Sequence, residues 1–433
     1  MSAALMCDLY ELTMAQIYFN ENRHEKAVFN FFVRPSPKRN YYLFAGLQQL
    51  LHYLENLHFS QQDIAYLRSL GKFSEDFLEY LQNFRFCGDV WAFEEGEFFF
   101  ANEPVVQVEA SLIDAQIIET ALINILQIAI LTATKAMRCK SVAGETVLVD
   151  FGARRAQGFD AAHAAARGSY IAGFLGTSNL EAGRRYGIPV FGTMAHSFIL
   201  AHESEEEAFE AFAKTYPESS IFLVDTYDTL EGVKKAIEAA KKLGLQLKGV
   251  RLDSGDIVAL AKESRKLLDA AGFKDAKIFV SGGLNEYKIK EILQSGAPVD
   301  AWGVGTELAV SADMPYLDCA YKLVELDGVP KMKRSTGKVT LPGKKELYRL
   351  YENGLVKHDV VALYGEKIDG EVLLQKIMER GKVVKPLPSL QELRQQCAKN
   401  FSRLPPEVRA LDGKSVAVEL SEGLEKLLAT MTS

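Results

Sequence analysis

Seven short apolar runs, each followed by a small polar cluster and then by a helical stretch, dominate the middle of this 433-residue chain. The runs lie within residues 145–155, 171–179, 188–197, 220–229, 247–256, 277–286 and 300–308. Buried parallel strands read as continuous apolar runs rather than as alternating ones. The repeat therefore predicts an α/β fold with a parallel sheet. We expect an irregular (β/α) TIM-like barrel, with a doubly wound open sheet as the alternative.

The flanking segments differ from this repeat, and the length of the chain favours two or three substructures. We expect an N-terminal α/β domain over 1–130, the barrel over 131–325, and a C-terminal segment over 326–433 that packs back on the N-terminal domain. Helices are predicted over 8–19, 389–401 and 419–430, and a strand over 26–34. Residues 331–354 read as two or three antiparallel strands with a turn at the "PGKK" of 342–345.

Charge and cysteine usage exclude several classes of protein. A net charge of −7 argues against general nucleic-acid binding, which needs a basic face. The five cysteines form no Cys-x-x-Cys pair, so we expect neither a structural metal nor a disulfide framework, as in a reducing cytoplasm. The apolar run 120–137 contains Asn124, Gln127 and Lys135, which favours a core helix over a membrane span.

The polar clusters should meet at one end of the parallel sheet, where such barrels carry their active sites. Three arginines suit carboxylate or phosphate groups: Arg154, Arg155 and Arg251. The small residues of 281–283 and 303–306 let backbone N–H groups approach phosphate oxygens, and 176–179 adds hydroxyl and amide donors. This mixture suits a phosphorylated sugar accompanied by a small anion.

Each of these features also has an ordinary structural explanation. The carboxylates of Asp225, Asp228, Asp253 and Asp256 could hold Mg²⁺ or sugar hydroxyls, although Asp225 and Asp228 could equally cap a helix. Taken alone, His196 is more often a structural histidine than a reacting group. The occurrence of anion-compatible groups after all seven runs is what favours a functional site.

The order of the motifs resembles the nicotinate phosphoribosyltransferase family. The resemblance rests on "DLYELTMAQ", "DFGARRAQG", "GTSN", "GTMAHSF", "VDTYDT", "GVRLDSGD", "FVSGGLNE", "GVGTEL" and "KRSTGKVTLPGKK", from residue 8 to about 345. It implies a type II phosphoribosyltransferase, usually dimeric, with an irregular α/β barrel and a domain built from both chain ends. Such enzymes condense nicotinate with phosphoribosyl pyrophosphate, coupled to ATP hydrolysis, and Mg²⁺ accompanies the phosphates.

The resemblance also implies roles for individual residues. His196 would accept the γ-phosphoryl group of ATP, Thr193 and Arg251 would bind nicotinate, and Asp253 would face the ribose. Tyr10 would stack on the pyridine ring, from the partner subunit of a homodimer. The ribose and its phosphates would be held by Arg154 or Arg155, Gly282, Gly283 and Thr306. Asp8, Ser178, Asp225 and Gly305 complete the expected substrate-binding set. The cysteines of a zinc cluster found in some archaeal relatives are missing.

Three alternatives stay open at this point. The same fold could act on nicotinamide or quinolinate. A sugar-phosphate enzyme using a lysine Schiff base would need a lysine at a strand tip, and none stands there. A binding module without catalysis is the third alternative. The basic stretch 331–349 could hold ATP or the phosphoribosyl donor, but a solvated hairpin is the preferred interpretation.

Overall fold

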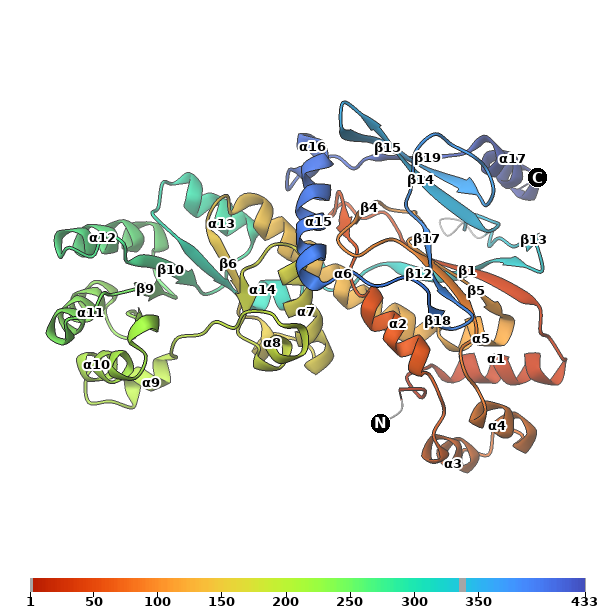
Figure 1. Cartoon of the computed structure of the whole chain (residues 1–433), viewed down its shortest axis with the longest axis horizontal. Coiled ribbons are helices and arrows are strands. Elements are labelled where there is room, and N and C mark those ends of the chain that lie inside the picture. The colour runs from red at the N-terminus through yellow and green to blue at the C-terminus, as the bar shows by residue number, and fades with distance from the viewer. Residues whose placement is uncertain (1–2, 335–339, 433) are drawn as a thin grey trace. The chain divides into compact units, whose positions relative to one another are not determined.

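A computed structural model describes residues 3–334 and 340–432, and these form two compact units. The terminal unit contains the chain up to Leu131 and again from Tyr316, so both chain ends contribute to it, and the central unit is Thr132–Pro315 (Figure 1). The boundary expected at residue 325 differs, because β12 (Cys319–Leu326) pairs along its length with β1 (Lys26–Val33) of the terminal unit.

The terminal unit is built on two main sheets. The larger has the order β13-β12-β1-β5-β3-β17-β18, and the smaller has the order β16-β14-β15-β19. Their remaining strands are β3 (Asp89–Ala92), β5 (Val106–Ser111), β13 (Val329–Pro330), β14 (Lys345–Glu352), β15 (Leu355–Leu363), β16 (Glu371–Val372), β17 (Gln375–Glu379), β18 (Lys382–Val383) and β19 (Ala417–Leu420); β2 (Tyr42–Leu43) pairs with β4 (Phe98–Phe99). The strand expected over 26–34 is confirmed.

The segment 331–354 contains only part of what its sequence predicts. Its last strand, β14, forms an antiparallel hairpin with β15, but the turn lies at Asn353–Gly354, where both residues have positive φ. In the turn expected at 342–345, Gly343 lies in a bend with positive φ, but Lys345 is already the first residue of β14. Residues 335–339 of this segment, and of the motif "KRSTGKVTLPGKK", lie outside the described residues.

Helices cover the sheets of the terminal unit (Figure 1). They are α1 (Leu9–Asn20), α2 (Leu47–Asn56), α3 (Gln61–Ser69), α4 (Glu75–Gln82), α5 (Leu112–Ile117), α15 (Leu390–Arg403), α16 (Pro406–Arg409) and α17 (Glu422–Thr432). The helices expected over 8–19 and 389–401 are α1 and α15, whereas the one expected over 419–430 begins later, as α17, because its first residues belong to β19. The unit boundary falls within α6 (Glu119–Val142). α6 is long and apolar enough to cross a membrane, but 67% of its most apolar stretch is buried inside the protein, as in a core helix.

The central unit has a parallel sheet in the order β7-β6-β11-β10-β9-β8. These strands are β6 (Val147–Asp150), β7 (Gly176–Thr177), β8 (Ile221–Leu223), β9 (Gly249–Leu252), β10 (Lys277–Ser281) and β11 (Ala301–Val304). The predicted parallel α/β architecture is confirmed. The run 188–197 contributes only a bridge between Val190 and Thr177, and the preceding Pro189 has no N–H for a longer ladder. Among the described residues, no backbone pairing joins Val190 to β8, so the ladder is open at that point.

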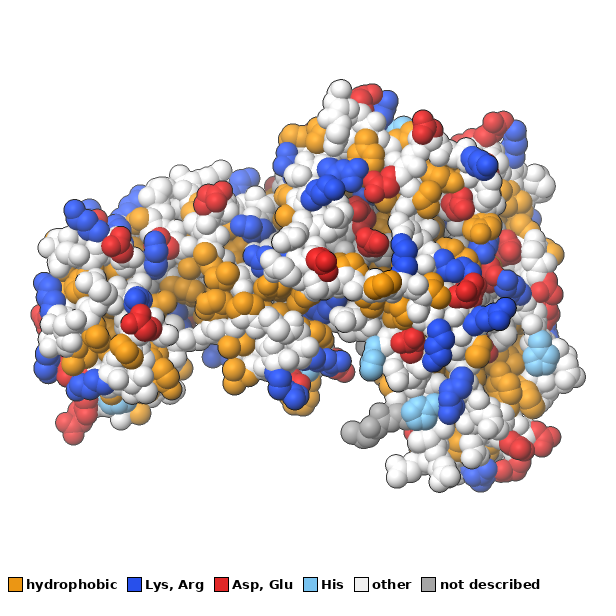
Figure 2. Space-filling model, viewed as in Figure 1, with side chains coloured by type: hydrophobic (Ala, Val, Ile, Leu, Met, Phe, Trp, Pro, Cys, Tyr) orange, Lys and Arg blue, Asp and Glu red, His pale blue; other side chains and the backbone are white. Residues whose placement is uncertain are grey.

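Helices follow the strands, as the repeat predicts. They are the 3₁₀ turn Ala153–Arg155, α7 (Phe159–Ile171), α8 (Leu180–Tyr186), α9 (His196–Leu200), α10 (Glu205–Thr215), the 3₁₀ turn Pro217–Ser219, α11 (Thr229–Leu243), α12 (Ile257–Ala270), α13 (Glu286–Gln294) and α14 (Thr306–Ala309). Acidic and basic side chains are interspersed on the face of the molecule in Figure 2, as is usual for a surface without one dominant field.

Candidate active site

Arg251 joins two segments of the central unit at the point where the ladder is open. Its Nη1 donates hydrogen bonds to Thr193 Oγ1 (2.8 Å) and to the carbonyl of Met194 (3.1 Å). The side chain is only 12% exposed, and burial lowers the pKa of the guanidinium. Its buried Nε has no hydrogen-bond partner among the described residues. The side chain is therefore fixed on one side and keeps donors for an anion on the other.

His196 lies close to Arg251, and its imidazole ring faces two carboxylates. It is the first residue of α9, and its Nδ1 is 3.1 Å from Thr226 Oγ1. Its Nε2 is 3.9 Å from Asp225 Oδ1 and 4.0 Å from Asp253 Oδ2. The side chain is 40% exposed. The contact with Thr226 orients the ring and leaves Nε2 as the nitrogen that can react.

Asp225 and Asp253 belong to one hydrogen-bond network at the ends of β8, β9 and β10. Asp225 Oδ2 accepts hydrogen bonds from the backbone N–H of Asp253 (3.1 Å) and from Ser254 Oγ (2.6 Å). Asp253 Oδ1 accepts a short hydrogen bond from Ser281 Oγ. Asp225 caps no helix: Asp228 caps α11, accepting from the N–H of Glu231, and Asp256 caps α12 in the same way. The buried Asp225 Oδ1 has no hydrogen-bond partner among the described residues.

The glycine pair after β10 brings the backbone close to this network. Gly282 and Gly283 have φ values of +88° and +57°, a conformation that L side chains rarely adopt. A Cβ atom on Gly282 would lie 1.9 Å from the carbonyl oxygen of Asp253. Lys288, an exposed residue of α13, donates a hydrogen bond to the carbonyl of Gly283 (2.8 Å). The packing of β9 against β10 at this end thus depends on glycine at position 282.

We expect Gly282→Ala to lower kcat/KM of the reaction proposed below by about tenfold. The left-handed backbone and the clash with Asp253 together cost about 1–3 kcal/mol. Steady-state kinetics measures this. Gly296→Ala is the matched control: its φ is +71°, but a Cβ there would meet nothing within 4 Å. Equal kinetic effects of the two substitutions would contradict a specific role for the contact between Gly282 and Asp253.

Asp150, at the end of β6, organises the other side of the site and is not among the residues that the sequence analysis selected. It is fully buried, and its carboxylate accepts hydrogen bonds from the N–H of Gly152 (2.7 Å) and from Thr177 Oγ1 (2.7 Å). Burial raises the pKa of this carboxyl. Its backbone carbonyl accepts the N–H of Ser178. Asp150 therefore holds the loops that carry Ser178 and the two arginines. Its position at the end of an apolar run was the sequence feature from which this role could have been predicted.

The remaining predicted residues occupy more exposed positions. Arg154 and Arg155 are both exposed on the 3₁₀ turn after β6, so burial does not distinguish them. Gly305 precedes α14, and Thr306 is its exposed first residue. Asp8 and Tyr10 belong to the terminal unit. Asp8 precedes α1 but its side chain makes no capping hydrogen bond, and Tyr10 is 44% exposed. Burial and then Glu119 raise the pKa of Tyr10.

Metal ligands can be sought among the acidic, histidine and cysteine side chains of the described residues. In residues 3–334 and 340–432 no group of three or more His, Cys, Asp or Glu side chains is placed to hold a metal ion. The pair of Asp225 and Asp253, with a buried carboxylate oxygen left unpaired, is a donor set of the kind that Mg²⁺ uses together with substrate phosphates and water.

Comparisons with known proteins agree on one family. Residues 5–127, 146–353 and 367–428 match the N-terminal domain, the family core and the C-terminal domain of nicotinate phosphoribosyltransferase (NAPRTase). The chain is 47% identical to nicotinate phosphoribosyltransferase pncB2 of Mycobacterium tuberculosis, covering 99% of this chain and 94% of the relative. It is 43% identical to nicotinate phosphoribosyltransferase of Bacillus subtilis, covering 86% and 79%.

Two solved structures resemble the whole chain. Human nicotinic acid phosphoribosyltransferase has a TM-score of 0.87 at 30% identity, with 98% of this chain and 99% of that one covered. A nicotinate-nucleotide pyrophosphorylase of Pyrococcus furiosus has a TM-score of 0.77 at 30% identity, with 93% and 95% covered. Family matches along most of the chain and two relatives above 40% identity lead to one conclusion: this chain belongs to the nicotinate phosphoribosyltransferase family.

Proposed function

We propose that this protein condenses nicotinate with phosphoribosyl pyrophosphate to give nicotinate mononucleotide and pyrophosphate, in NAD biosynthesis. The observation that carries the proposal is Arg251, a buried cation fixed by Thr193 with donors left over, next to a histidine and two carboxylates at the strand ends. A pyridine carboxylate is a small, flat anion that such a guanidinium binds in a defined orientation.

The residues around Arg251 suit the chemistry of this condensation. The ring nitrogen of nicotinate attacks the anomeric carbon with its own lone pair, so the N–C bond forms without a general base while the C–O bond to pyrophosphate breaks. Positioning is the main task, and Arg251 with Thr193 serves it. Asp253, held by Ser281, stabilises the positive charge that develops on the ribose. Ser178, Gly282, Gly283, Gly305, Thr306 and one of Arg154 and Arg155 hold the ribose and phosphate oxygens.

Mg²⁺ fits the two carboxylates beside His196. Asp225, with its unpaired buried oxygen, and Asp253 would hold the ion together with the pyrophosphate oxygens. When bound, the ion supplies charge neutralisation to the pyrophosphate leaving group.

We further propose that ATP hydrolysis is coupled to the reaction through His196. Nε2 attacks the γ-phosphorus of ATP, the bond to the bridging oxygen breaks, and ADP leaves. The phosphoramidate formed is labile, so water can later release the phosphate and reset the site. The contact of Nδ1 with Thr226 holds the ring so that Nε2 faces the site.

The test measures nicotinate mononucleotide and ADP in one assay, with ATP and phosphoribosyl pyrophosphate present and nicotinate either added or left out. We expect mononucleotide only when nicotinate is added, and ADP to increase with it. Mononucleotide formation with no effect of nicotinate on ADP would overturn the coupling but not the condensation. Absence of mononucleotide with active ATP hydrolysis would overturn the condensation.

The finer features of the fold belong to the same proposal. The parallel sheet forms an irregular barrel, in which the bonds of Arg251 to Thr193 and Met194 and of His196 to Thr226 connect the segments where the ladder is open. The protein is a cytoplasmic homodimer, and the partner subunit supplies Tyr10 and Asp8 to the site.

We expect Tyr10→Ala to raise KM for nicotinate about three- to tenfold, because an aromatic stack contributes about 0.5–1.5 kcal/mol. In mixed dimers with Arg251→Met subunits, KM for nicotinate should return toward the wild-type value, since Tyr10 of one chain then meets Arg251 of the other. The control is Tyr66→Ala, which removes an exposed tyrosine of α3 and should leave KM for nicotinate unchanged. Mixed dimers whose KM for nicotinate stays as high as that of Tyr10→Ala would place Tyr10 in its own subunit's site.

A further inference from the structure

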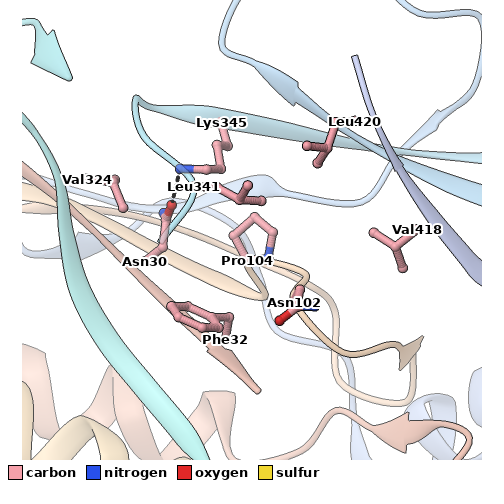
Figure 3. Close-up of a pocket in the computed structure, with 9 residues that line it drawn as sticks. All are labelled: Asn30, Phe32, Asn102, Pro104, Val324, Leu341, Lys345, Val418 and Leu420. Carbon is pink, nitrogen blue, oxygen red and sulfur yellow. Dashed lines mark hydrogen bonds between the residues drawn. The ribbon is translucent and has the colours of Figure 1, made fainter. Parts of the chain in front are cut away.

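The terminal unit contains a cavity of about 280 Å³ that none of the proposed catalytic residues lines (Figure 3). Its walls come from the larger sheet through β1 and β12, from the smaller sheet through β14 and β19, and from the loop after β4. The lining residues are Asn30, Phe32, Asn102, Pro104, Val324, Leu341, Lys345, Val418 and Leu420. The cavity thus lies where side chains of two sheets leave space between them.

Lys345 is the charged side chain among these nine residues, and it is 2% exposed. Its Nζ donates hydrogen bonds to Asn30 Oδ1 (2.9 Å) and to the carbonyl of Gly343 (2.6 Å), and Figure 3 shows it pointing toward Asn30. Asn30 is held in turn by Gln107, whose Oε1 also accepts the N–H of Lys345. The lysine is therefore fixed by a network of buried amides, not by a carboxylate.

Arg349, four residues further along β14, is a buried cation of the same unit whose charge is balanced by carboxylates. Its guanidinium forms ion pairs with Asp359 and with Glu97. Lys345 has no carboxylate within salt-bridge distance among the described residues. Glu325 of β12 interacts with Lys345 electrostatically without forming an ion pair with it. The Oε2 atom of Glu325 accepts a hydrogen bond from the backbone N–H of Lys344. Burial lowers the pKa of Lys345 to about 7. A buried ammonium without a counter-charge is costly, and an anion in the cavity would offset that cost.

Apart from Asn30 and Asn102, the rest of the lining is apolar. Val324 and Pro104 are buried, Phe32, Leu341, Val418 and Leu420 are half-buried, and Asn102 is exposed. A volume of this size holds about ten non-hydrogen atoms, since one water takes about 30 Å³ in the liquid. We propose that the cavity binds a small monocarboxylate with an apolar body, its carboxylate on Lys345 Nζ and its body between Phe32, Val418 and Leu420.

The proposal makes the affinity depend on pH in a defined direction. A carboxylate binds the ammonium form of Lys345, so binding is tightest below pH 7 and weakens as the pH rises through about 7. Other charged groups nearby do not line the cavity: Lys344 pairs with Glu109 and lies over the rings of Trp91 and Tyr364, and Glu325 binds the backbone. Asn30 and Gln107 do not titrate.

Calorimetric titration of the full chain with hexanoate at pH 6 and pH 8 tests this site, with hexanamide as the neutral analogue. We expect saturable binding of hexanoate that is about tenfold weaker at pH 8, since the charged fraction of a group with pKa near 7 falls by that factor. Hexanamide should bind much less. Lys345→Met should remove the binding and its pH dependence, and Lys357→Met, an exposed lysine on β15, should change neither.

Two further variants make the result decisive. Val418→Phe enlarges a lining side chain on β19 and should block hexanoate while leaving Lys345 in place, which covers the case in which Lys345→Met does not fold. Arg251→Met removes the proposed nicotinate anchor in the central unit and should leave hexanoate binding unchanged. Absence of binding, equal binding of hexanamide, or binding that survives both Lys345→Met and Val418→Phe would overturn the proposal. These outcomes do not depend on the phosphoribosyltransferase activity.

Discussion

Arg251→Met is expected to lower kcat/KM for nicotinate by about 10²- to 10³-fold. The guanidinium is fixed by Thr193 and Met194, and its side chain is only 12% exposed, so its remaining donors would meet the carboxylate of the proposed substrate in a largely desolvated position. Removing one partner of such a buried charge pair costs about 3–4 kcal/mol, and each 1.4 kcal/mol is a factor of ten. Initial rates with nicotinate varied at saturating phosphoribosyl pyrophosphate measure this loss.

The control for this prediction is Lys248→Met, which removes an exposed cation just before β9 that pairs with Glu218. It should leave kcat/KM within about twofold, because surface ion pairs contribute little. Nicotinamide provides a second comparison: without a carboxylate it should gain nothing from Arg251, so the variant loses most of its discrimination between the two bases. An unchanged kcat/KM for nicotinate in Arg251→Met would show that another group binds the carboxylate.

His196→Ala is expected to abolish an acid-labile phosphoryl label from γ-labelled ATP. Nε2 is the atom that we propose accepts the phosphoryl group, and alanine offers no nucleophile in its place. Stimulation of mononucleotide synthesis by ATP should disappear in the same variant. Autoradiography of the acid-sensitive, base-stable label measures the first effect, and initial rates with and without ATP measure the second.

His202→Ala is the matched control for this experiment. His202 lies six residues further along the chain and its Nδ1 contacts the carbonyl of Phe198, away from Asp225 and Asp253. It should keep the label and the response to ATP. A label that persists in His196→Ala would contradict the assignment, and a label lost only in His202→Ala would place the phosphoryl group on the wrong histidine.

The part of the fold that follows from local pattern could be predicted from the sequence. The apolar runs predicted the strands of the central unit, and the family resemblance of the motifs selected Arg251, His196 and Asp253, which the structure brings together. The exception is the run at 188–197, which forms only a bridge because Pro189 interrupts the ladder. The proposed closure into a barrel would depend on side-chain contacts that no periodicity encodes.

Features that depend on residues far apart in the chain could not be predicted from local sequence pattern. Lys345 lies in a basic stretch that reads as a solvated hairpin, yet it is buried by bonds to Asn30 and Gln107, more than 200 residues away. Asp150 reads as a strand-end carboxylate, and only its bonds to Gly152 and Thr177 show that it organises the loops. The choice between Arg154 and Arg155 stays a prediction, since both are exposed.

Base preference tests the central claim most directly. Purified protein is given phosphoribosyl pyrophosphate, Mg²⁺ and ATP with nicotinate, nicotinamide or quinolinate as the sole base, and the mononucleotide formed is measured by mass spectrometry. A site in which Arg251 and Thr193 hold a single carboxylate predicts a kcat/KM for nicotinate at least about 10²-fold above that for nicotinamide or quinolinate. A preference for nicotinamide or for quinolinate would contradict the account.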